Sequence, residues 1–510
     1  MAEICVSSHH GSIMELLNDP EFRALAGREG FLIELRLDSY RDLNAATFSM
    51  ALDKLGRNVV VTYRHPDEGG KRPGISDNDR LWYLQKAADR GVRYVDIEAR
   101  TTRGYFKKGQ SKLIISFHDF EKVPSFDALK AKLLSMAGDG DCDVIKIACM
   151  PETIFDTAPL LDLLLPGATG SGLMTTKPII VLGMGEAGFW TRPAGPVFGS
   201  PFTYARAVNA PGTAPGQPSW LDLEDVYRFR ELQPGWPVYG VIGNPIGHSL
   251  SPLLHNTALK HLRLPGVYLP FKVEGDVQRF LEIFERMDLR ALAVTIPHKE
   301  EALDVCDEVH ELAKSVGAVN TLIRRPDGTW WGTNTDAFAA ADALEAVTGS
   351  LYGKNVLVMG AGGAAKAVAF GVKTRGAVVF VVNRTIEHAV TLASAVDGNL
   401  IKYEELDGKP NFAAVVNTTP LGMYPDMHRT PLEKDQIPDG SIVFDTVYNP
   451  KRTRLLQLAE EKGCKTLEGV AMFLRQGARQ FELYTGAKMP MELCEQAVLN
   501  ELERREARQS

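Results

Sequence analysis

The chain has 510 residues, a length that exceeds a single hydrophobic core and predicts two or three domains. Hydrophobic residues make up 45% and charged residues 24% of it, which is ordinary globular content and supplies enough apolar side chains for sizeable cores. A formal net charge of −7, without a run of five or more basic residues, argues against nucleic acid binding and favours small-molecule substrates.

Cysteine usage and hydropathy point to a reducing compartment. The six cysteines (Cys5, Cys142, Cys149, Cys306, Cys464 and Cys494) contain no C-x-x-C pair, so we expect reduced thiols and neither a disulfide framework nor a structural metal. No apolar run reaches the ~18 residues of a membrane span, and "MAEICVSSHHGS" lacks the basic and then apolar pattern of an export signal. We therefore expect a cytoplasmic protein, or a plastid one in a plant, with no membrane partner.

The first 230 residues alternate short β-rich runs with helical stretches. The eight candidate strands are "ICVSS", "FLIELRL", "NVVVTYR", "RYVDIE", "LIISFH", "DVIKIA", "PIIVLGM" and "PVFGSPF". Eight βα repeats in about 225 residues have the size and rhythm of a (β/α)₈ barrel. The stretch "RELQPGWPVYG" then places Pro234, Gly235 and Pro237 before a new strand, which predicts a domain boundary there.

Strand parity predicts that a lysine lies inside this barrel. In "CDVIKIACMP", residues 142–151, Lys146 shares one face with Val144 and Ala148, while Ile145 and Ile147 point outward to the helices. The same parity turns further polar side chains inward, near the carboxyl ends of strands where barrel enzymes carry their active sites: Glu34, Arg36, Asp38, Thr62, Arg64, Asp96, Glu98, Ser116 and His118. Any one of these can simply satisfy a buried neighbour, but their convergence indicates an active site.

A buried lysine beside a histidine suits one kind of chemistry. Desolvation and neighbouring cations lower the pKa of an amine, which in its neutral form attacks a ketone to form a Schiff base. The iminium acidifies the adjacent C–H, and His118 can remove that proton near neutral pH. Arg64, and Arg192 in "MGEAGFWTR", can clamp a substrate carboxylate through paired guanidinium bonds.

These residues carry a family resemblance. The segments "ELRLD", "VTYR", "VDIE", "SFHDF", "VIKIA", "MGEAGFWTR", "FGSPFTYA" and "APGQ" resemble a type I 3-dehydroquinate dehydratase. The resemblance implies that Lys146 forms the Schiff base, that His118 is the general acid/base oriented by Glu98, and that 3-dehydroquinate loses water to give 3-dehydroshikimate. It also implies substrate contacts by Ser7, Glu34, Arg36, Arg64, Arg192, Ser200 and Gln217. Thr191 stands where the family has serine.

The middle of the chain starts a second α/β block. "GNPIGHSLSPLLHN" places Ser249 and Ser251 ahead of a helix, where hydroxyls and backbone amides can bind a carboxylate, although such serines are also common helix caps. "AVTIPHKEEAL" offers Lys299 at a strand-to-helix turn, and "GAVNTLI" and "GTNTDAFA" offer Asn320 and Asp336. Spacing alone leaves open whether Lys299 and Asp336 form a catalytic pair or a surface ion pair.

A nucleotide-binding block follows. The strand "NVLVMG" runs into "GAGGAAKAVAFG", where Gly360, Gly362 and Ala365 fit G-x-G-x-x-G/A, and a second strand "VVFVV" completes the βαβ context. This second strand ends in "NRT" rather than in an acidic residue. We therefore expect a cofactor 2′-phosphate beside Arg384, and hence NADP, against the alternative of an unrelated surface arginine.

Together the later motifs resemble shikimate dehydrogenase. The resemblance implies shikimate binding by Ser249, Ser251, Thr295, Asn320, Asp336, Tyr448 and Gln476, with Lys299 and Asp336 as the catalytic pair. It implies cofactor contacts by Gly360, Ala361, Gly362, Gly363, Ala364, Asn383, Arg384, Thr385, Asn417 and Thr418. Ala293 and Ala337 replace the family's usual asparagine and glycine, which leaves substrate preference less defined.

We therefore expect a bifunctional enzyme. A dehydratase barrel would span residues 1–232, a substrate-binding domain 238–337 with a C-terminal helix in 470–510, and a Rossmann domain 338–469. The first site would make 3-dehydroshikimate and the second would reduce it to shikimate with NADPH. The alternatives are a quinate dehydrogenase in the second half, disfavoured by the two hydroxyls of Ser249 and Ser251, and a non-catalytic scaffold, disfavoured by the complete set of reactive residues. The oligomeric state stays open, a homo-oligomer included, as does transfer of substrate between the sites.

Overall fold

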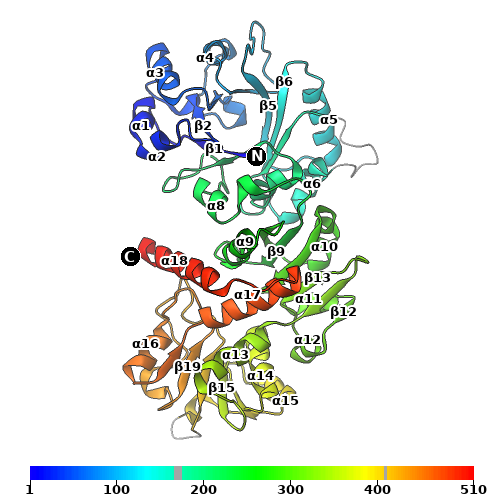
Figure 1. Ribbon diagram of the computed structural model, residues 1–510, viewed down its shortest axis with the longest axis vertical. Coiled ribbons are helices and arrows are strands. Elements are labelled where there is room, and N and C mark those ends of the chain that lie inside the picture. Colours follow the sequence, from blue (N-terminus) through cyan, green and yellow to red (C-terminus); the bar gives the residue numbers. More distant parts are fainter. Residues whose placement is uncertain (166–174, 407–410, 510) are drawn as a thin grey trace. The chain divides into compact units, whose positions relative to one another are not determined.

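The computed structural model describes residues 1–165, 175–406 and 411–509 (Figure 1). The chain divides into two compact units, one of residues 1–240, 244–252 and 263–289, the other of residues 241–243, 253–262 and 290–510. Within the described ranges, no helix combines the length and the apolar character needed to cross a membrane.

Eight parallel strands form a nearly closed barrel in the first unit, in the order β7-β6-β5-β4-β3-β2-β1-β8, and this confirms the predicted fold. The strands are β1 (Glu3–Ser7), β2 (Phe31–Arg36), β3 (Val59–Thr62), β4 (Tyr94–Glu98), β5 (Lys112–Asp119), β6 (Cys142–Cys149), β7 (Ile179–Gly183) and β8 (Phe202–Ala205). The helices are α1 (Ile13–Asn18), α2 (Pro20–Leu25), α3 (Ala45–Leu55), α4 (Asp77–Asp89), α5 (Phe126–Ala137), α6 (Ala158–Leu164), α7 (Thr191–Ala194) and α8 (Trp220–Asp225).

The barrel interior follows the predicted alternation of side chains. Val144 and Ala148 of β6 belong to one buried cluster with apolar residues of the other strands, so Lys146 between them faces the interior. The last strand differs from the prediction. Residues Gly195–Phe198 form a 3₁₀ turn that ends at Gly199, whose φ of +85° favours glycine, and β8 begins only at Phe202.

A bulge interrupts the pairing of β5 with β6. Leu113 pairs with Cys142, but the next residue, Ile114, pairs with Val144, so that Asp143 has no partner in the ladder. The Asp143 carboxylate accepts the backbone N–H of Leu113 at 2.7 Å and the Lys108 ammonium at 2.9 Å. Beyond the bulge the register is regular, with Ser116 beside Lys146 and His118 beside Ala148.

A second sheet of six strands has the order β10-β9-β11-β13-β14-β12. These strands are β9 (Val238–Gly243), β10 (Val267–Lys272), β11 (Leu289–Val294), β12 (Glu308–Val309), β13 (Thr321–Arg324) and β14 (Trp330–Thr333). The helices along this part of the chain are α9 (Ser251–His261), α10 (Val277–Phe284), α11 (Glu301–Asp304), α12 (Glu311–Val316) and α13 (Asp336–Thr348). The pairs β11–β13 and β13–β14 are antiparallel, so this sheet is mixed.

The third sheet is parallel throughout, in the order β17-β16-β15-β18-β19-β20. Its strands are β15 (Asn355–Met359), β16 (Val378–Val382), β17 (Asn399–Leu400), β18 (Ala414–Asn417), β19 (Ile442–Asp445) and β20 (Lys465–Leu467). The helices are α14 (Gly363–Thr374), α15 (Ile386–Ala395), α16 (Arg454–Glu461), α17 (Val470–Thr485) and α18 (Met491–Gln509). Buried valines and alanines of β15, β16 and α14 form one core, as expected of a Rossmann-like sheet covered by helices.

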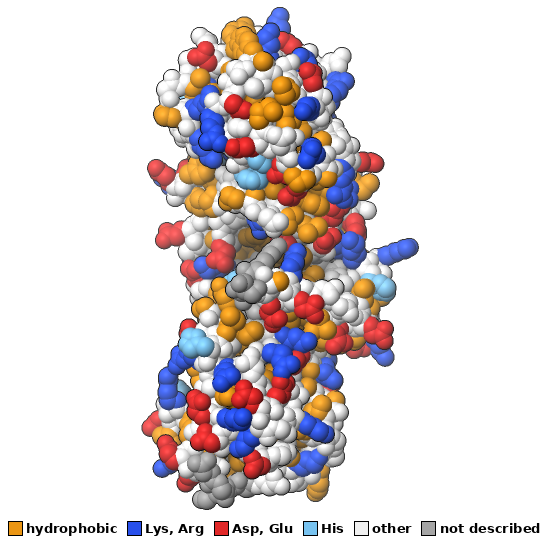
Figure 2. Space-filling model, turned by 90° about the vertical axis from the view of Figure 1, so that its left-hand side faces the viewer, with side chains coloured by type: hydrophobic (Ala, Val, Ile, Leu, Met, Phe, Trp, Pro, Cys, Tyr) orange, Lys and Arg blue, Asp and Glu red, His pale blue; other side chains and the backbone are white. Residues whose placement is uncertain are grey.

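On the face drawn in Figure 2, basic and acidic side chains are interspersed instead of gathered by sign. Exposed charges of the described residues also form ion pairs, such as Lys314 with Glu311 at 2.8 Å. Such pairs contribute little to stability, so they serve as useful controls for buried charge pairs.

Candidate active sites

A buried lysine amine lies at the centre of the barrel site. Lys146 is 5% exposed, and its Nζ lies 3.1 Å from Asp96 Oδ2 and 4.0 Å from the ring centroid of Tyr204. Burial lowers the pKa of Lys146, a shift that Asp96 opposes and Arg64 reinforces. The amine is therefore held in one position while its neutral, nucleophilic form is favoured relative to an exposed lysine.

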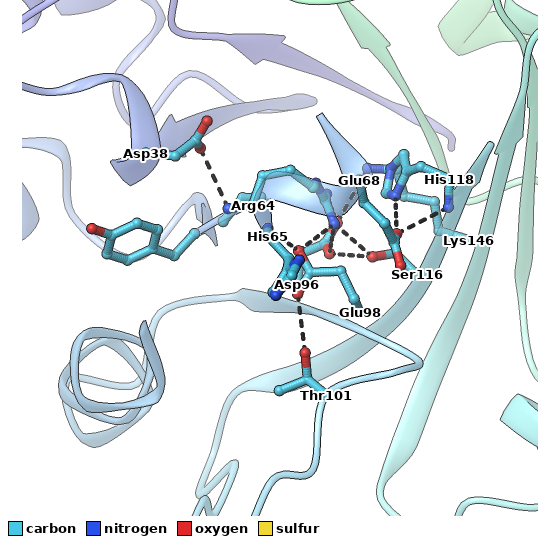
Figure 3. Close-up of polar contacts among 12 residues, drawn as sticks. Asp38, Arg64, His65, Glu68, Asp96, Glu98, Thr101, Ser116, His118 and Lys146 are labelled. Carbon is cyan, nitrogen blue, oxygen red and sulfur yellow. Dashed lines mark hydrogen bonds and ion pairs between the residues drawn. The ribbon is translucent and has the colours of Figure 1, made fainter. Parts of the chain in front are cut away.

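A network of charged side chains holds Asp96, the partner of Lys146, in place (Figure 3). Arg64 donates to both carboxylate oxygens of Asp96 at 3.0 and 3.1 Å, to Glu98 at 3.0 Å and to Ser116 at 2.9 Å. Burial alone would raise the pKa of Asp96, but Arg64 and Lys146 hold it below its usual range. The other side of Glu98 binds the buried Arg80 of α4. Arg64 lines the pocket and positions Asp96 through these bonds, and its contact with a substrate carboxylate stays a prediction.

His118 faces a different carboxylate from the one predicted. Its Nδ1 lies 2.9 Å from Glu68 Oε2, and its backbone N–H donates to the same oxygen at 3.0 Å. The predicted orienting residue, Glu98, accepts bonds from Arg64, Arg80 and the backbone of His65 instead. Burial, Arg64 and Lys146 hold the pKa of His118 well below its usual range, so the imidazole is neutral and able to accept a proton.

The buried guanidinium of Arg192 is suited to bind an anion. Arg192 is 1% exposed and lines the same pocket as Lys146 and His118, yet among the described residues its side chain donates only to the carbonyls of Tyr204 at 3.5 Å and Pro215 at 3.4 Å. Its Nε has no partner among the residues that the structure describes, and burial lowers its pKa to about 10. A buried cation without a carboxylate partner is costly, and a bound carboxylate would remove that cost.

The remaining predicted residues of the barrel take different places. Glu34 lines the pocket and accepts from Ser7 at 2.6 Å, whereas Arg36 also lines it but pairs with Asp38. Gln217 lines the pocket and accepts the backbone N–H of Thr213 at 2.7 Å.

Ser200 is a correction to the prediction. It precedes β8, at the amino end of the strand, and donates to the carbonyl of Ile179 at 2.9 Å, at the opposite end of the barrel from the pocket. Thr213, in the loop that follows β8, lines the pocket instead.

Lys299 and Asp336 meet in the second unit. Lys299 lies in the turn between β11 and α11, Asp336 is the first residue of α13, and Lys299 Nζ is 2.6 Å from Asp336 Oδ2. The side chains are 17% and 8% exposed, so this pair is largely withdrawn from solvent. A Cβ atom added to Gly363 would lie 3.6 Å from Lys299 Cδ, which puts the lysine beside the first turn of α14.

Other predicted residues surround or support this pair. Asn320 accepts the N–H of Thr335 at 2.8 Å and donates to its hydroxyl at 3.0 Å, so it fixes the residue before Asp336. The Tyr448 ring stacks on Phe473 with centroids 4.7 Å apart, and Gln476 donates to the carbonyl of the same residue at 2.9 Å. The backbone N–H of Thr295 donates to Ile242 at 3.0 Å. Ser249 accepts the N–H of Ser251 at 3.3 Å in the first unit, and their approach to the other residues stays a prediction.

The glycine turn after β15 fits a nucleotide pyrophosphate. Gly360 has φ of +116°, and a side chain there would lie 2.6 Å from Thr418 Oγ1. Gly362 precedes α14, and no side chain in the described part of the chain caps that helix end, so its N–H groups are available to phosphate. Ala361, Gly363 and Ala364 complete the turn. At the end of β16, Asn383 donates to the carbonyl of Thr385 at 2.9 Å and Arg384 is exposed.

Four family models match, and together they cover most of the chain. The type I 3-dehydroquinase model matches residues 4–234, and the shikimate dehydrogenase substrate binding domain matches 241–322. The shikimate/quinate 5-dehydrogenase model matches residues 342–418, and the shikimate 5′-dehydrogenase C-terminal domain matches 469–499.

A protein of Arabidopsis thaliana, the chloroplastic bifunctional 3-dehydroquinate dehydratase/shikimate dehydrogenase, is 38% identical over 488 residues, or 91% of this chain and 79% of that protein. The chain belongs to this bifunctional family. A shikimate dehydrogenase (NADP(+)) of Methanosarcina acetivorans is 40% identical over 282 residues, 52% of this chain and 99% of that protein. A solved shikimate dehydrogenase in complex with NADP+ is 34% identical, with a TM-score of 0.50, over 52% of this chain and 96% of its own.

Sequence reasoning missed three residues of this bifunctional enzyme. Glu68 lies in a 3₁₀ turn after β3, where strand parity makes no prediction. Tyr204 lies on β8, which begins later in the chain than its sequence pattern predicts. Asp445 ends β19 and accepts from Asn417 at 3.0 Å and Thr453 at 2.6 Å, and burial raises its pKa to about 6. The one sequence signal for Asp445 is its place in "FDTVYNP", three residues before Tyr448.

The Glu68–His118 contact predicts a pH dependence of the dehydratase reaction. Burial raises the pKa of Glu68 to about 7, so its carboxylate form is present above that pH and lost as the pH falls through it. We expect wild-type kcat/KM to fall below about pH 7, because protonated Glu68 no longer accepts from the histidine ring. Glu68→Gln should lower kcat by about 10–100-fold and remove this limb from a profile measured over about pH 5.5–8.5.

Glu121→Gln is the matched control for this experiment, because Glu121 is an exposed carboxylate three residues after His118. It should keep both the wild-type rate and the wild-type profile. A Glu68→Gln enzyme whose pH profile follows that of the wild type would show that this carboxylate does not act on His118.

Proposed function

We propose that residues 1–232 carry 3-dehydroquinate dehydratase activity and that residues 238–510 carry NADP-dependent shikimate dehydrogenase activity, with a substrate-binding domain at 238–337 and 470–510 and a Rossmann domain at 338–469. The product of the first site is the substrate of the second, so consecutive steps of aromatic amino acid biosynthesis share one chain. The observation that carries the first assignment is the buried amine of Lys146 beside Asp96, in a pocket that also holds His118 and Arg192.

In the dehydratase site, Lys146 would attack the ketone carbon, and loss of one water would leave an iminium. His118 would then remove a proton from the adjacent carbon to give an enamine, with Glu68 holding the imidazole. Expulsion of the substrate hydroxyl takes the proton back from His118 and releases the second water. Hydrolysis of the remaining iminium consumes one water and frees the amine, so the balance is the loss of one water.

In the dehydrogenase site, NADPH supplies the hydride that reduces the ketone. The alkoxide that forms needs a proton, and the Lys299 ammonium is the cationic donor beside Asp336. Asp336 would accept a hydrogen bond from a substrate hydroxyl while it holds the Lys299 amine in place. Ser249, Ser251, Asn320, Tyr448 and Gln476 are the proposed shikimate contacts, and the glycine turn at Gly360 would receive the pyrophosphate.

We propose shikimate over quinate as the product because both serines of the predicted carboxylate site are present. One mixture distinguishes the alternatives: wild-type protein with 3-dehydroquinate and NADPH should consume NADPH and form shikimate. In Lys146→Ala the same mixture should consume no NADPH, since no 3-dehydroshikimate is made. Quinate formation with steady NADPH consumption by that variant would instead identify a quinate dehydrogenase, and an inert wild type would support a scaffold.

We also propose a compartment that keeps thiols reduced, either cytoplasm or plastid. All six cysteines are free thiols in the structure, and the Arabidopsis relative is named as chloroplastic.

Arg384 carries the proposed preference for NADPH. A charge-assisted contact to the 2′-phosphate is worth about 1.5–3 kcal/mol, and NADH lacks that group. Arg384→Ala should therefore raise KM for NADPH by about 10–100-fold and leave KM for NADH nearly unchanged, as measured by steady-state reduction of 3-dehydroshikimate. Arg452→Ala, at an exposed arginine of the same domain, should change neither value. An equal rise in KM for NADPH and for NADH would contradict the assignment of Arg384 to the 2′-phosphate.

A further inference from the structure

Two histidines and an aspartate meet just beyond the first barrel strand, in a part of the chain that neither reaction uses. His9 and His10 follow β1, and Asp19 precedes α2. His10 Nε2 lies 3.0 Å from Asp19 Oδ2, and the rings of His9 and His10 have centroids 4.2 Å apart. One ligand atom from each of the three side chains lies within 4.8 Å of the other two.

From this juxtaposition we propose that His9, His10 and Asp19 bind one divalent transition ion of the zinc class. Imidazole nitrogen and carboxylate oxygen are zinc ligands, and three protein ligands with a fourth position left to water is a common arrangement for this ion. Tetrahedral bonds of about 2.0–2.1 Å place ligand atoms about 3.3 Å apart, close to the separation of His10 and Asp19. This site departs from the expectation of no structural metal, which rested on the absence of clustered cysteines.

Two of the three ligands are already oriented by other groups. The second nitrogen of His10, Nδ1, lies 3.3 Å from the Ser8 hydroxyl, so Nδ1–H can donate there and leave the Nε2 lone pair for the ion. The other oxygen of Asp19, Oδ1, accepts the backbone N–H groups of Glu21 at 2.7 Å and Phe22 at 3.4 Å. These bonds fix the carboxylate and leave Oδ2 directed at His10.

His9 supplies the observation that a simple ion pair does not explain. An ion pair between His10 and Asp19 needs no second imidazole, yet His9 Nδ1 is buried without a hydrogen-bond partner among the described residues. Phe22 packs edge-on against His10, with centroids 5.2 Å apart, and gives the cluster an apolar side.

The ion would tie down the loop between β1 and α2. Ser7, at the end of β1, donates to Glu34 in the wall of the dehydratase pocket. Because Ser8 joins Ser7 to the histidine pair, an ion bound there would stiffen this wall without contacting the reacting atoms. We accordingly place these residues outside the catalytic machinery, and expect metal-free protein to keep its dehydratase activity.

Competition between chelator-treated full-length protein and a fluorescent zinc indicator tests the site. We expect wild type to take up one Zn²⁺ per chain, and His9→Ala and His10→Ala to bind at least about tenfold more weakly. Asp19→Asn should lose affinity as well although asparagine preserves the cap of α2. His388→Ala, at an exposed histidine of α15, should bind as wild type does.

A second probe identifies the ligands and guards against misfolded variants. Co²⁺ bound by wild type should give visible ligand-field absorption that His10→Ala lacks, while both proteins keep the same circular dichroism and dehydratase rate. A wild type that takes up no Zn²⁺ from the indicator would overturn the site, and so would equal affinity in folded wild-type, His9→Ala and His10→Ala proteins.

Discussion

Replacement of Lys146 by alanine should abolish dehydration of 3-dehydroquinate, with kcat lower by at least about 10⁴-fold. No other amine of the described residues lines the pocket, so no substitute nucleophile is at hand. Borohydride added with substrate should trap a covalent adduct on wild type, detected as a mass increase on the peptide that contains residue 146, and none on the variant. Lys146→Met, which keeps most of the side-chain volume, should behave in the same way.

Reduction of supplied 3-dehydroshikimate by NADPH is the internal control for this variant. The residues proposed for this reduction lie outside the barrel. The Lys146→Ala variant should therefore reduce 3-dehydroshikimate at nearly the wild-type rate. A Lys146→Ala protein that dehydrates its substrate at a comparable rate would exclude the Schiff-base mechanism, whereas loss of both activities would indicate misfolding and leave Lys146→Met as the decisive variant.

Replacement of Lys299 by alanine should lower kcat for 3-dehydroshikimate reduction by roughly 10²–10⁴, the usual range for a general acid. Its KM should change much less, because the amine acts mainly on the alkoxide that develops in the transition state. Asp336→Asn should lower kcat and also raise KM, since it weakens a substrate contact. Steady-state rates with saturating NADPH measure both parameters.

The surface ion pair of Lys314 with Glu311 is the matched comparison. Lys314→Ala removes a lysine from an exposed pair and should cost at most about 1 kcal/mol of stability, with unchanged kinetics. Lys299→Ala would resemble it if the Lys299–Asp336 contact were merely structural. A Lys299→Ala enzyme within about threefold of wild-type kcat would therefore remove this lysine from the reaction.

Periodicity predicts the parts of the structure that repeat. The barrel and the Rossmann-like sheet follow from alternating apolar runs, and strand parity places Lys146 among inward-facing residues. Parity makes no statement about a side chain beyond the end of its strand. Glu68 lies in such a turn, and the family resemblance assigns its role to Glu98, which the structure instead shows between two arginines.

The sequence likewise does not show which charged side chains pair with one another. Arg64 and Arg192 look alike as carboxylate clamps, yet tertiary contacts give Arg64 three polar partners and leave Arg192 with two long bonds to backbone carbonyls. The prediction for Ser200 is wrong because the sequence pattern starts β8 too early, and a few residues along a strand decide which end of a barrel a side chain reaches.

The bulge at Asp143 decides whether the nucleophile and the proton carrier can act on one molecule. With uninterrupted pairing from Leu113 onward, His118 would stand beside Ile147, whose side chain points to the helices, and partners in a ladder share a face. The unpaired Asp143 shifts the register by one residue, so that His118 pairs with Ala148. His118 and Lys146 then both face the interior, two positions apart along the strands. The backbone bulge therefore determines that these two side chains face the same interior. Deletion of residue 143 would turn one of them out of the barrel interior, although the chain would keep every reactive side chain.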